Sequence, residues 1–418
     1  MDSSTSGQIA AKAPLVVTML AALRFLAVWG PGLLVILADS DAGNVVTAAQ
    51  AGALWGYRLL PLLLLLIPLL FMVQELAVRL GVFTGRGFGE LIGDCFGKSW
   101  AWLSVAALAI ATIGSLITEF TGIAGIGELY GLPRPLTLAV AAGALLAVVL
   151  TGSYRRIERV ALAIGMFEAA FFAVAWAAHP DAAVVLSEAV DIPAGNPEFL
   201  YLAAALVGAV FNPWMVFYQQ SAVADKGLTA GDLRAERWDT AIGAVLTQLL
   251  TASVLIAGAA ALRGHGIGSV GAISEALTPL LGTEMARPVF SAGVLGAAMV
   301  AAIVSSLALA WGVGEVAGVR RGLEGRAAGA PWFYGVYAGG VIGSALVVWL
   351  VSDLIWLNIA AQVLNAFLLP LVVGLLVALA IKALPVGQQL RGWYLWLVVG
   401  LSSIVCALGL AGGLSAVF

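Results

Sequence analysis

Long apolar stretches, separated by short polar turns, follow one another along nearly the whole chain. At about 20 apolar residues for each membrane crossing, this pattern predicts eleven spans and no soluble domain in any turn. The spans cover approximately residues 25–56, 59–82, 99–127, 135–153, 157–178, 199–224, 237–262, 286–311, 332–351, 355–382 and 392–416. The sequence therefore predicts an all-α integral membrane protein.

Two of these spans are interrupted by polar residues near their middle. The first span breaks at Asp39-Ser40-Asp41-Ala42-Gly43-Asn44, and the sixth breaks at Phe211-Asn212-Pro213. Carboxylates are costly at membrane depth, and irregular backbone is tolerated there only within protein or beside a cavity. A pair of broken helices in corresponding halves of a membrane protein indicates the substrate site of a transporter.

The two breaks are five spans apart, so the two halves of the chain enter the membrane from opposite sides. This spacing predicts a five-plus-five inverted repeat with residues 24–384 as the transport core. The first repeat covers about residues 24–178 and the second about residues 199–384. Residues 1–23 are expected to form a cytoplasmic tail, and residues 385–418 the eleventh helix.

The composition agrees with a polytopic membrane protein. Of the 418 residues, 62% are hydrophobic and 10% are charged, and the mean hydropathy is +1.04. All but four of the 20 Lys and Arg residues fall on the side of the N-terminus. This predicts a cytoplasmic N-terminus and an external C-terminus in the cell inner (plasma) membrane. Cys95 and Cys406 give neither a disulfide framework nor a metal-ligand spacing.

The first break carries the residues expected to bind a cation. Asp41 and Asn44 are about one helical turn apart, so both side chains can face one point, and Gly43 lets the backbone free carbonyls such as that of Ala38. Carboxylate, amide and carbonyl oxygens favour a hard divalent cation. Alternatively, Asp41 only caps the half-helix that follows. Asp39 is a second ligand, a vestibule charge or a neighbour that perturbs Asp41.

The second break offers neutral groups. Pro213 removes a helix hydrogen bond, Asn212 supplies an amide, and the carbonyl of Ala209 is expected to turn toward the ion. Gln219 and Gln220 add two more amides downstream. Their side chains are suited to a hydrated ion, although glutamines also commonly bridge helices.

Several stretches resemble the Nramp family of divalent metal transporters. The sequence DAGNVVTAAQAGALWGYRLL of residues 41–60 is similar to the family's Asp-Pro-Gly-Asn followed by Gln-x-Gly-Ala-x-x-Gly-Tyr, with Ala42 in place of the proline. Further similarity lies at residues 74–90, 208–209, 213, 221–222, 362–363 and 370–371. The resemblance covers most of the chain in order and implies a LeuT-like fold, with helices 1 and 6 broken, and transport of a divalent metal.

Two departures from the family's motifs concern the metal ligands. The family's Met-Pro-His in the sixth helix reads Asn212-Pro213-Trp214 here, and its second histidine falls at Gln219 or Gln220. A thioether favours transition metals, whereas an amide oxygen favours Mg²⁺. The chain is therefore most similar to the Nramp-related magnesium transporter branch.

Two further departures concern the proton relay and the tenth helix. The third-helix Asp-x-x-Glu pair of the family reads Leu116 and Glu119, and the tenth-helix glutamine reads Leu368, with Asn365 one turn earlier as a substitute. Without the titratable partners of Glu119, proton coupling is not expected.

Together these patterns predict a secondary transporter, not an enzyme, that imports divalent cations, with Mg²⁺ preferred, Mn²⁺ accepted and no proton coupling. The expected partners are the cation and the lipid bilayer, with no nucleic acid, no inferable protein partner and no cofactor besides the transported ion. One alternative is a proton-coupled Mn²⁺ or Fe²⁺ importer, and another is a carrier of organic substrates such as amino acids. The predicted metal-site residues are Asp41, Asn44, Asn212, Ala38, Ala209, Asn365, Gln219 and Gln220.

Overall fold

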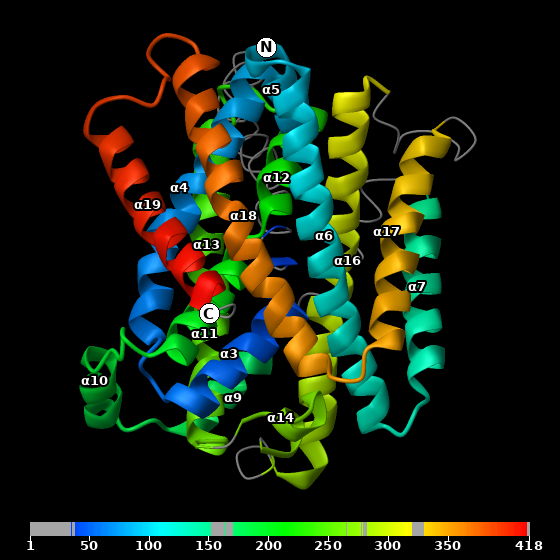
Figure 1. The fold of residues 1–418 in the computed structure, drawn as a ribbon, viewed down its shortest axis with the longest axis vertical. Coiled ribbons are helices and arrows are strands. Elements are labelled where there is room, and N and C mark those ends of the chain that lie inside the picture. The colour runs from blue at the N-terminus through cyan, green and yellow to red at the C-terminus, as the bar shows by residue number, and fades with distance from the viewer. Residues whose placement is uncertain are drawn as a thin grey trace, which may run out of the picture.

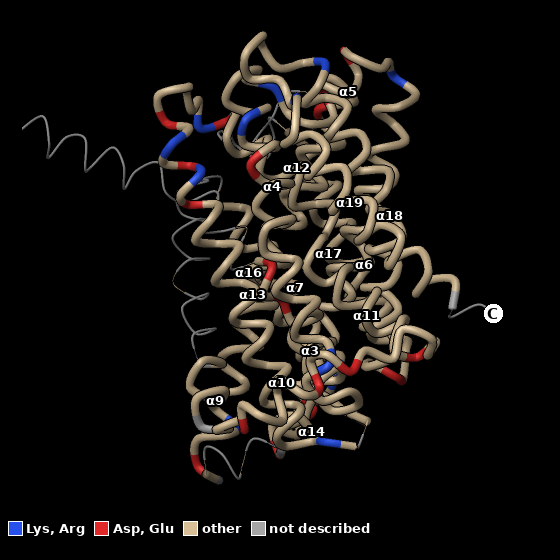
Figure 2. The backbone as a smooth tube through the Cα atoms, turned by 90° about the vertical axis from the view of Figure 1, so that its left-hand side faces the viewer, with Lys and Arg blue, Asp and Glu red and all other residues tan. Residues whose placement is uncertain are grey.

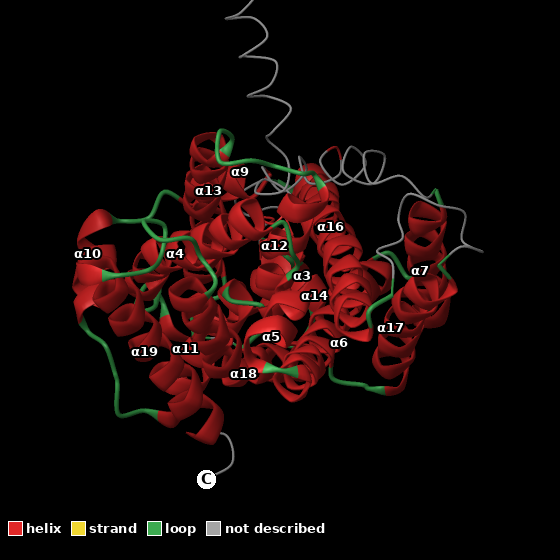
Figure 3. Cartoon of the chain, turned by 90° about the horizontal axis from the view of Figure 1, so that it is seen from above, coloured by secondary structure: helices red, strands yellow, loops and turns green. Residues whose placement is uncertain are grey.

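The protein is a bundle of helices (Figures 1 and 3). The computed structural model describes residues 38–151, 170–264, 266–276, 282–319 and 330–415, together with Val35, Ala163 and Thr278. The described helices are α3 (Ala42–Trp55), α4 (Leu60–Thr84), α5 (Phe88–Phe96), α6 (Lys98–Leu129), α7 (Arg134–Leu150), α9 (Ala170–Ala178), α10 (Ala182–Val190), α11 (Pro197–Val210), α12 (Pro213–Asp225), α13 (Leu233–Ala261), α14 (Val270–Ala276), α16 (Thr283–Ala317), α17 (Pro331–Leu350), α18 (Leu354–Lys382) and α19 (Gly392–Ser415).

Within the described part of the chain, eight helical segments are long and apolar enough to cross a membrane, with α11 and α12 counted as one. Helix α7 is apolar but shorter. The spans expected at residues 25–56 and 157–178 lie partly outside the described residues. The helical membrane fold is therefore confirmed, whereas the count of eleven spans stays a prediction.

Charged residues gather at the two ends of the bundle, and its middle is apolar (Figure 2). One end carries α5 and the other carries α10 and α14 (Figure 1), and we call them the α5 end and the α10 end. The predicted orientation would put the α5 end in the cytoplasm.

Helix α3 is enclosed by its neighbours and forms the centre of the arrangement. It contacts α6, α11, α13 and α18, and nearly all its residues are buried. Glycines lie where α3 crosses α13. A Cβ at Gly52 would collide with the backbone of Leu255, and a Cβ at Gly258 would collide with the backbone of Ala49. Such glycine contacts let two membrane helices approach closely.

At the α10 end, helix α10 is fastened to the ends of α3 and α13. The Glu188 carboxylate accepts the N–H of Tyr57 (3.0 Å) and pairs with Arg263. Asp191, just after α10, pairs with Arg58 (2.8 Å). We call this set of contacts the α10 strap.

At the α5 end, polar contacts join the α4–α5 turn and α5 to α12. Glu315 on α16 accepts the N–H of Gly89 (3.0 Å) and the hydroxyl of Ser221 (2.5 Å). The side-chain amide of Gln220 donates to the carbonyl of Arg86 (3.0 Å). These bonds hold the second half of the broken sixth span against its neighbours.

Candidate metal site

The first predicted break is present, and Asp41 is at its centre. The chain leaves helical geometry after Asp39 and re-enters it at Ala42, where α3 begins. Oxygen Oδ1 of the fully buried Asp41 accepts the N–H of Asn44 (2.5 Å) and so caps α3, whereas Oδ2 accepts no hydrogen bond. Asp41 therefore caps the half-helix and still has one oxygen available for a ligand.

The break also orients the buried side chain of Asn44. Its Nδ2 donates to the carbonyl of Asp39 (3.0 Å), which leaves Oδ1 without a donor. The free oxygens of Asp41 and Asn44 thus belong to residues one turn apart, as predicted. Ala38 is buried directly before the break, and the use of its carbonyl as a ligand stays a prediction.

Glu119 on α6 is a second carboxylate at this break. Its Oε2 accepts the N–H of Ala42 (3.0 Å), and its Oε1 accepts the hydroxyl of Thr118 (3.3 Å). The first N–H groups of a helix have no partner within the helix, so Glu119 satisfies one of them with a favourable charge. The carboxyl groups of Glu119 and Asp41 are also close enough to repel each other when both are ionised.

The second break is built from amides that bond to one another. Helix α11 ends at Val210, and α12 begins at Pro213, where the missing N–H of proline costs no helix hydrogen bond. The Asn212 side chain donates to the carbonyl of Ala209 (3.2 Å) and accepts from Nδ2 of Asn365 on α18 (2.6 Å). Nδ2 of Asn365 also donates to Oε1 of Gln362 (3.1 Å), whereas Oδ1 of Asn365 accepts no hydrogen bond.

Gln362 is the point where both broken spans meet α18. A Cβ at Gly43 in the first break would collide with Nε2 of Gln362 and crowd Thr118. A Cβ at Gly208, just before the second break, would collide with the backbone carbonyl of Gln362. The fully buried Gln362 therefore lies against Gly43 of the first break and is joined through Asn365 to Asn212 of the second.

The two glutamines predicted downstream of Asn212 have different surroundings. Gln219 is seven residues along from Asn212, on the same face of the helix, and its amide is fully buried without a hydrogen bond. Gln220 is bonded to the carbonyl of Arg86 at the α5 end. Its contact is the helix-bridging role that the sequence left open, and metal binding by either glutamine stays a prediction.

The sequence model described as "Nramp: Natural resistance-associated macrophage protein-like" matches residues 32–415. The chain belongs to the Nramp family. A relative from Bradyrhizobium diazoefficiens, named divalent metal cation transporter MntH, is 30% identical over 304 residues, which are 68% of this chain and 67% of that protein. The protein of the same name from Brucella suis is 28% identical over 301 residues, which are 68% of this chain and 66% of that protein.

Solved structures give the fold of this Nramp protein independently. The Eremococcus coleocola manganese transporter, in complex with a bis-isothiourea compound, superposes with a TM-score of 0.74 at 19% identity over 92% of this chain and 86% of that chain. The crystal structure of MhsT in complex with L-phenylalanine has a TM-score of 0.59 at 16% identity over 92% of this chain and 98% of that chain. The LeuT-like fold expected from the sequence is confirmed.

The departures from Nramp motifs occupy well-packed positions. Trp214, where the family motif has histidine, is fully buried. Leu116, where the motif has aspartate, is also fully buried and faces Gly340 of α17. The sequence reasoning did not include Gln362 and Thr118 among the residues near the breaks. Each is polar within an apolar span, and Gln362 also lies in a stretch similar to the family.

A pocket of about 490 Å³ lies at the α10 end between α3, α11 and α18. It is lined by Gln50, Leu54, Pro197, Glu198, Tyr201, Leu202, Trp356 and Ile359. The buried Asn358 on α18, next to the lining residue Ile359, accepts from the hydroxyl of Thr47 on α3 (3.5 Å) and donates to that of Thr121 on α6 (3.1 Å). Polar side chains on α3, α6 and α18 therefore continue from the pocket toward the first break.

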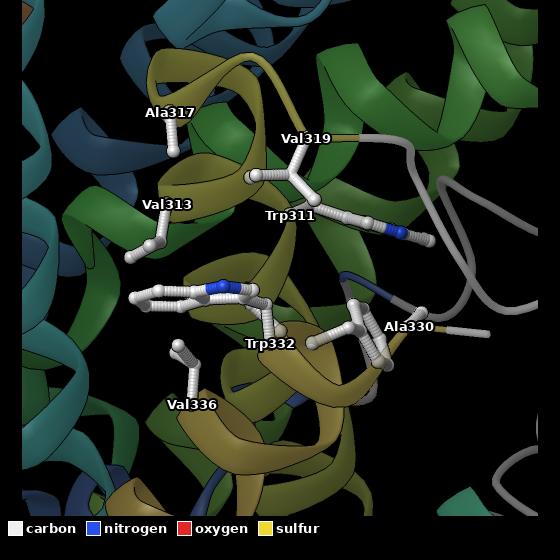
Figure 4. A pocket seen from close by; sticks show the side chains of 10 residues that line it. Trp311, Val313, Ala317, Val319, Ala330, Trp332 and Val336 are labelled. Atoms are coloured by element: carbon white, nitrogen blue, oxygen red, sulfur yellow. The ribbon is translucent and has the colours of Figure 1, made fainter. Parts of the chain in front are cut away.

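A second pocket, between the end of α16 and the start of α17, has a different character. Trp311, Trp332 and Val336 line it together with other apolar residues (Figure 4). Its lining offers no carboxylate or amide side chain, so it does not suit a cation. Among the described residues, no group of three or more His, Cys, Asp and Glu side chains is arranged to hold a metal. A metal at the breaks would therefore use amide or backbone oxygens beside carboxylates.

Proposed function

We propose that this protein imports divalent metal cations through a site between the two breaks, with Mn²⁺ as a substrate. The observation that carries the proposal is the pair of buried oxygens, Asp41 Oδ2 and Asn44 Oδ1, that accept no hydrogen bond. Buried polar oxygens normally have a donor, and a cation supplies an alternative partner. The names of the relatives, divalent metal cation transporter and manganese transporter, support the same substrate class.

The choice between Mn²⁺ and Mg²⁺ rests on two kinds of support. Carboxylate, amide and carbonyl oxygens suit both ions, and Asn212 supplies an amide rather than a thioether. The names of the relatives favour Mn²⁺ over the Mg²⁺ preference expected from the sequence. We therefore infer Mn²⁺ import as the main activity and keep uncoupled Mg²⁺ uptake as the second candidate, favoured by the all-oxygen donor set.

Proton coupling is part of the main proposal because Glu119 contacts the break directly. The sequence argued against coupling on the ground that Glu119 has no partner for its proton. Because the Asp41 carboxyl is close to it, two carboxyl groups share one dry site, and their repulsion is relieved by either a proton or a metal ion. Metal binding would then release a proton.

An organic substrate with a carboxylate is disfavoured by the same contacts. Transporters of this fold use the N-termini of half-helices to bind anionic substrate groups. Here the first N–H groups of α3 are taken by Asp41 and Glu119, and their negative charge would repel a carboxylate.

The test is uptake into proteoliposomes under an inside-negative potential, with Mn²⁺ or Mg²⁺ outside and a pH dye in the lumen. The main proposal expects Mn²⁺ uptake with acidification that is lost in Glu119→Gln. Mg²⁺ uptake with an unchanged lumenal pH would select the second candidate. Absence of uptake of both ions by the folded protein would contradict both.

A further inference from the structure

Asp39 is a buried acid that is not among the predicted metal-site residues. Its side chain is fully buried, and among the described residues neither carboxylate oxygen accepts a hydrogen bond or forms an ion pair. Ionised carboxylates are rarely buried without compensation, because the loss of hydration is very unfavourable. An acid in this position needs a partner that the surrounding helices do not provide.

Asp39 is also held beside the free oxygens of the first break. Its carbonyl accepts from the side chain of Asn44, whose own N–H donates to Asp41. Asp39 and Asp41 are thus tied to the same residue, and Asp41 is close enough to repel Asp39 when both are ionised. A cation between them would replace that repulsion with two attractions.

We propose that Asp39 is a second carboxylate ligand of the transported cation. This inference rests on the proposed function and specifies it: Asp39 and Asp41 would be the two carboxylate ligands, with Asn44 as a neutral donor. Two carboxylates match the charge of a dication and favour divalent over monovalent cations. A purely structural role is disfavoured because, within the described part of the chain, the Asp39 carboxylate makes no hydrogen bond or ion pair that its removal would break.

The test compares Asp39→Asn and Asp39→Glu with the wild-type full chain in detergent, using Mn²⁺ alone as the probe. Isothermal titration should show binding weakened roughly 10- to 100-fold in Asp39→Asn, in the range of changes around metal sites, and partly restored in Asp39→Glu. Asp353→Asn is the matched control, since it removes an exposed carboxylate that caps the start of α18 and should bind Mn²⁺ normally.

Thermal unfolding separates ligand binding from a structural role. Without metal, Asp39→Asn should unfold at the same or a higher temperature than wild type, because an uncompensated buried charge is gone. With Mn²⁺, its unfolding temperature should rise less than that of wild type. A lower unfolding temperature without metal, together with unchanged Mn²⁺ affinity, would overturn the inference.

The failure of this inference is distinguishable from failure of the proposed function. If wild type binds Mn²⁺ and Asp39→Asn binds it equally well, Asp39 is not a ligand, while metal transport stands. If wild type binds neither Mn²⁺ nor Mg²⁺, the proposed function fails, and the inference fails with it.

Discussion

The break before α3 contains carboxylates with oxygens that accept no hydrogen bond, whereas the break between α11 and α12 contains amides that bond to each other. Asp39 and Asp41 have free oxygens at the first break, and Asn212 is paired with Asn365 at the second. The Asn212 side chain has both a donor and an acceptor partner without a ligand, but buried charge requires compensation. The first break therefore depends more on a compensating ligand than the second.

The largest effect should come from removing charge at the first break. Asp41→Asn keeps the shape of the cap but removes the carboxylate, so uptake of every divalent cation should fall by more than the roughly 10- to 100-fold typical of changes around a metal ligand. Proteoliposome uptake of Mn²⁺ and Mg²⁺ measures this. Asp353→Asn, which alters the exposed cap of α18, is the control. Normal uptake by folded Asp41→Asn would place the site elsewhere.

Substituting alanine for the glycines of the two breaks should affect stability to different degrees. In Gly208→Ala the new methyl group meets the backbone of Gln362, so α18 must shift, and overpacking of this kind costs about 1–3 kcal/mol of stability. In Gly43→Ala it meets the end of the Gln362 side chain, which can turn away, and Cβ of Thr118, which is fixed by the backbone of α6. We expect a larger fall of the unfolding temperature for Gly208→Ala, and for Gly43→Ala a smaller fall with reduced uptake.

Gly343→Ala is the control for both glycine variants, because no atom lies within 4 Å of a Cβ at that position. If Gly43→Ala and Gly208→Ala lose stability equally, the surroundings of Gly43 yield no more easily than those of Gly208.

A sulfur ligand at the second break should change selectivity. Asn212→Met removes the bond to Asn365 and adds a thioether, which favours soft metals. The affinity for Cd²⁺ relative to Mn²⁺ should rise by about tenfold, or about 1.4 kcal/mol, by isothermal titration. Asn212→Leu, of similar size without sulfur, should not show this rise. Equal ratios in the two variants would mean that residue 212 does not touch the ion.

The smallest effect is expected from Gln220→Leu. Its amide holds the carbonyl of Arg86 at the α5 end, so the Mn²⁺ dissociation constant should stay within about twofold of wild type, a difference below 1 kcal/mol. Gln219→Leu, on the face of Asn212, is the matched comparison and should weaken binding or slow uptake more. If Gln220→Leu weakened Mn²⁺ binding more than Gln219→Leu does, Gln220 would have to be counted among the metal ligands.

The sequence predicted the two breaks well because a cluster of polar residues inside an apolar span is costly unless it lies within protein or beside a cavity. Asp41 illustrates the limit of that reasoning, since capping and ligation were weighed as alternatives, and the structure assigns one carboxylate oxygen to the cap and leaves the second oxygen free. Gln362 could not be placed from sequence, because a lone glutamine in a membrane helix must face protein but its pattern does not say which helix. For Gln220 the sequence allowed either a metal ligand or a bridge between helices, and in the structure its amide bonds to the carbonyl of Arg86.

The α10 strap has a mechanical consequence. Helix α10 grips the end of α3 through Glu188, and residues 191–196, which reach at most about 20 Å when extended, join it to α11. The half-helices α3 and α11, which lead to the two breaks, are therefore connected at this end by a short tether. A displacement of α10 would pull on both of them together, so an exposed surface segment is mechanically linked to both broken spans.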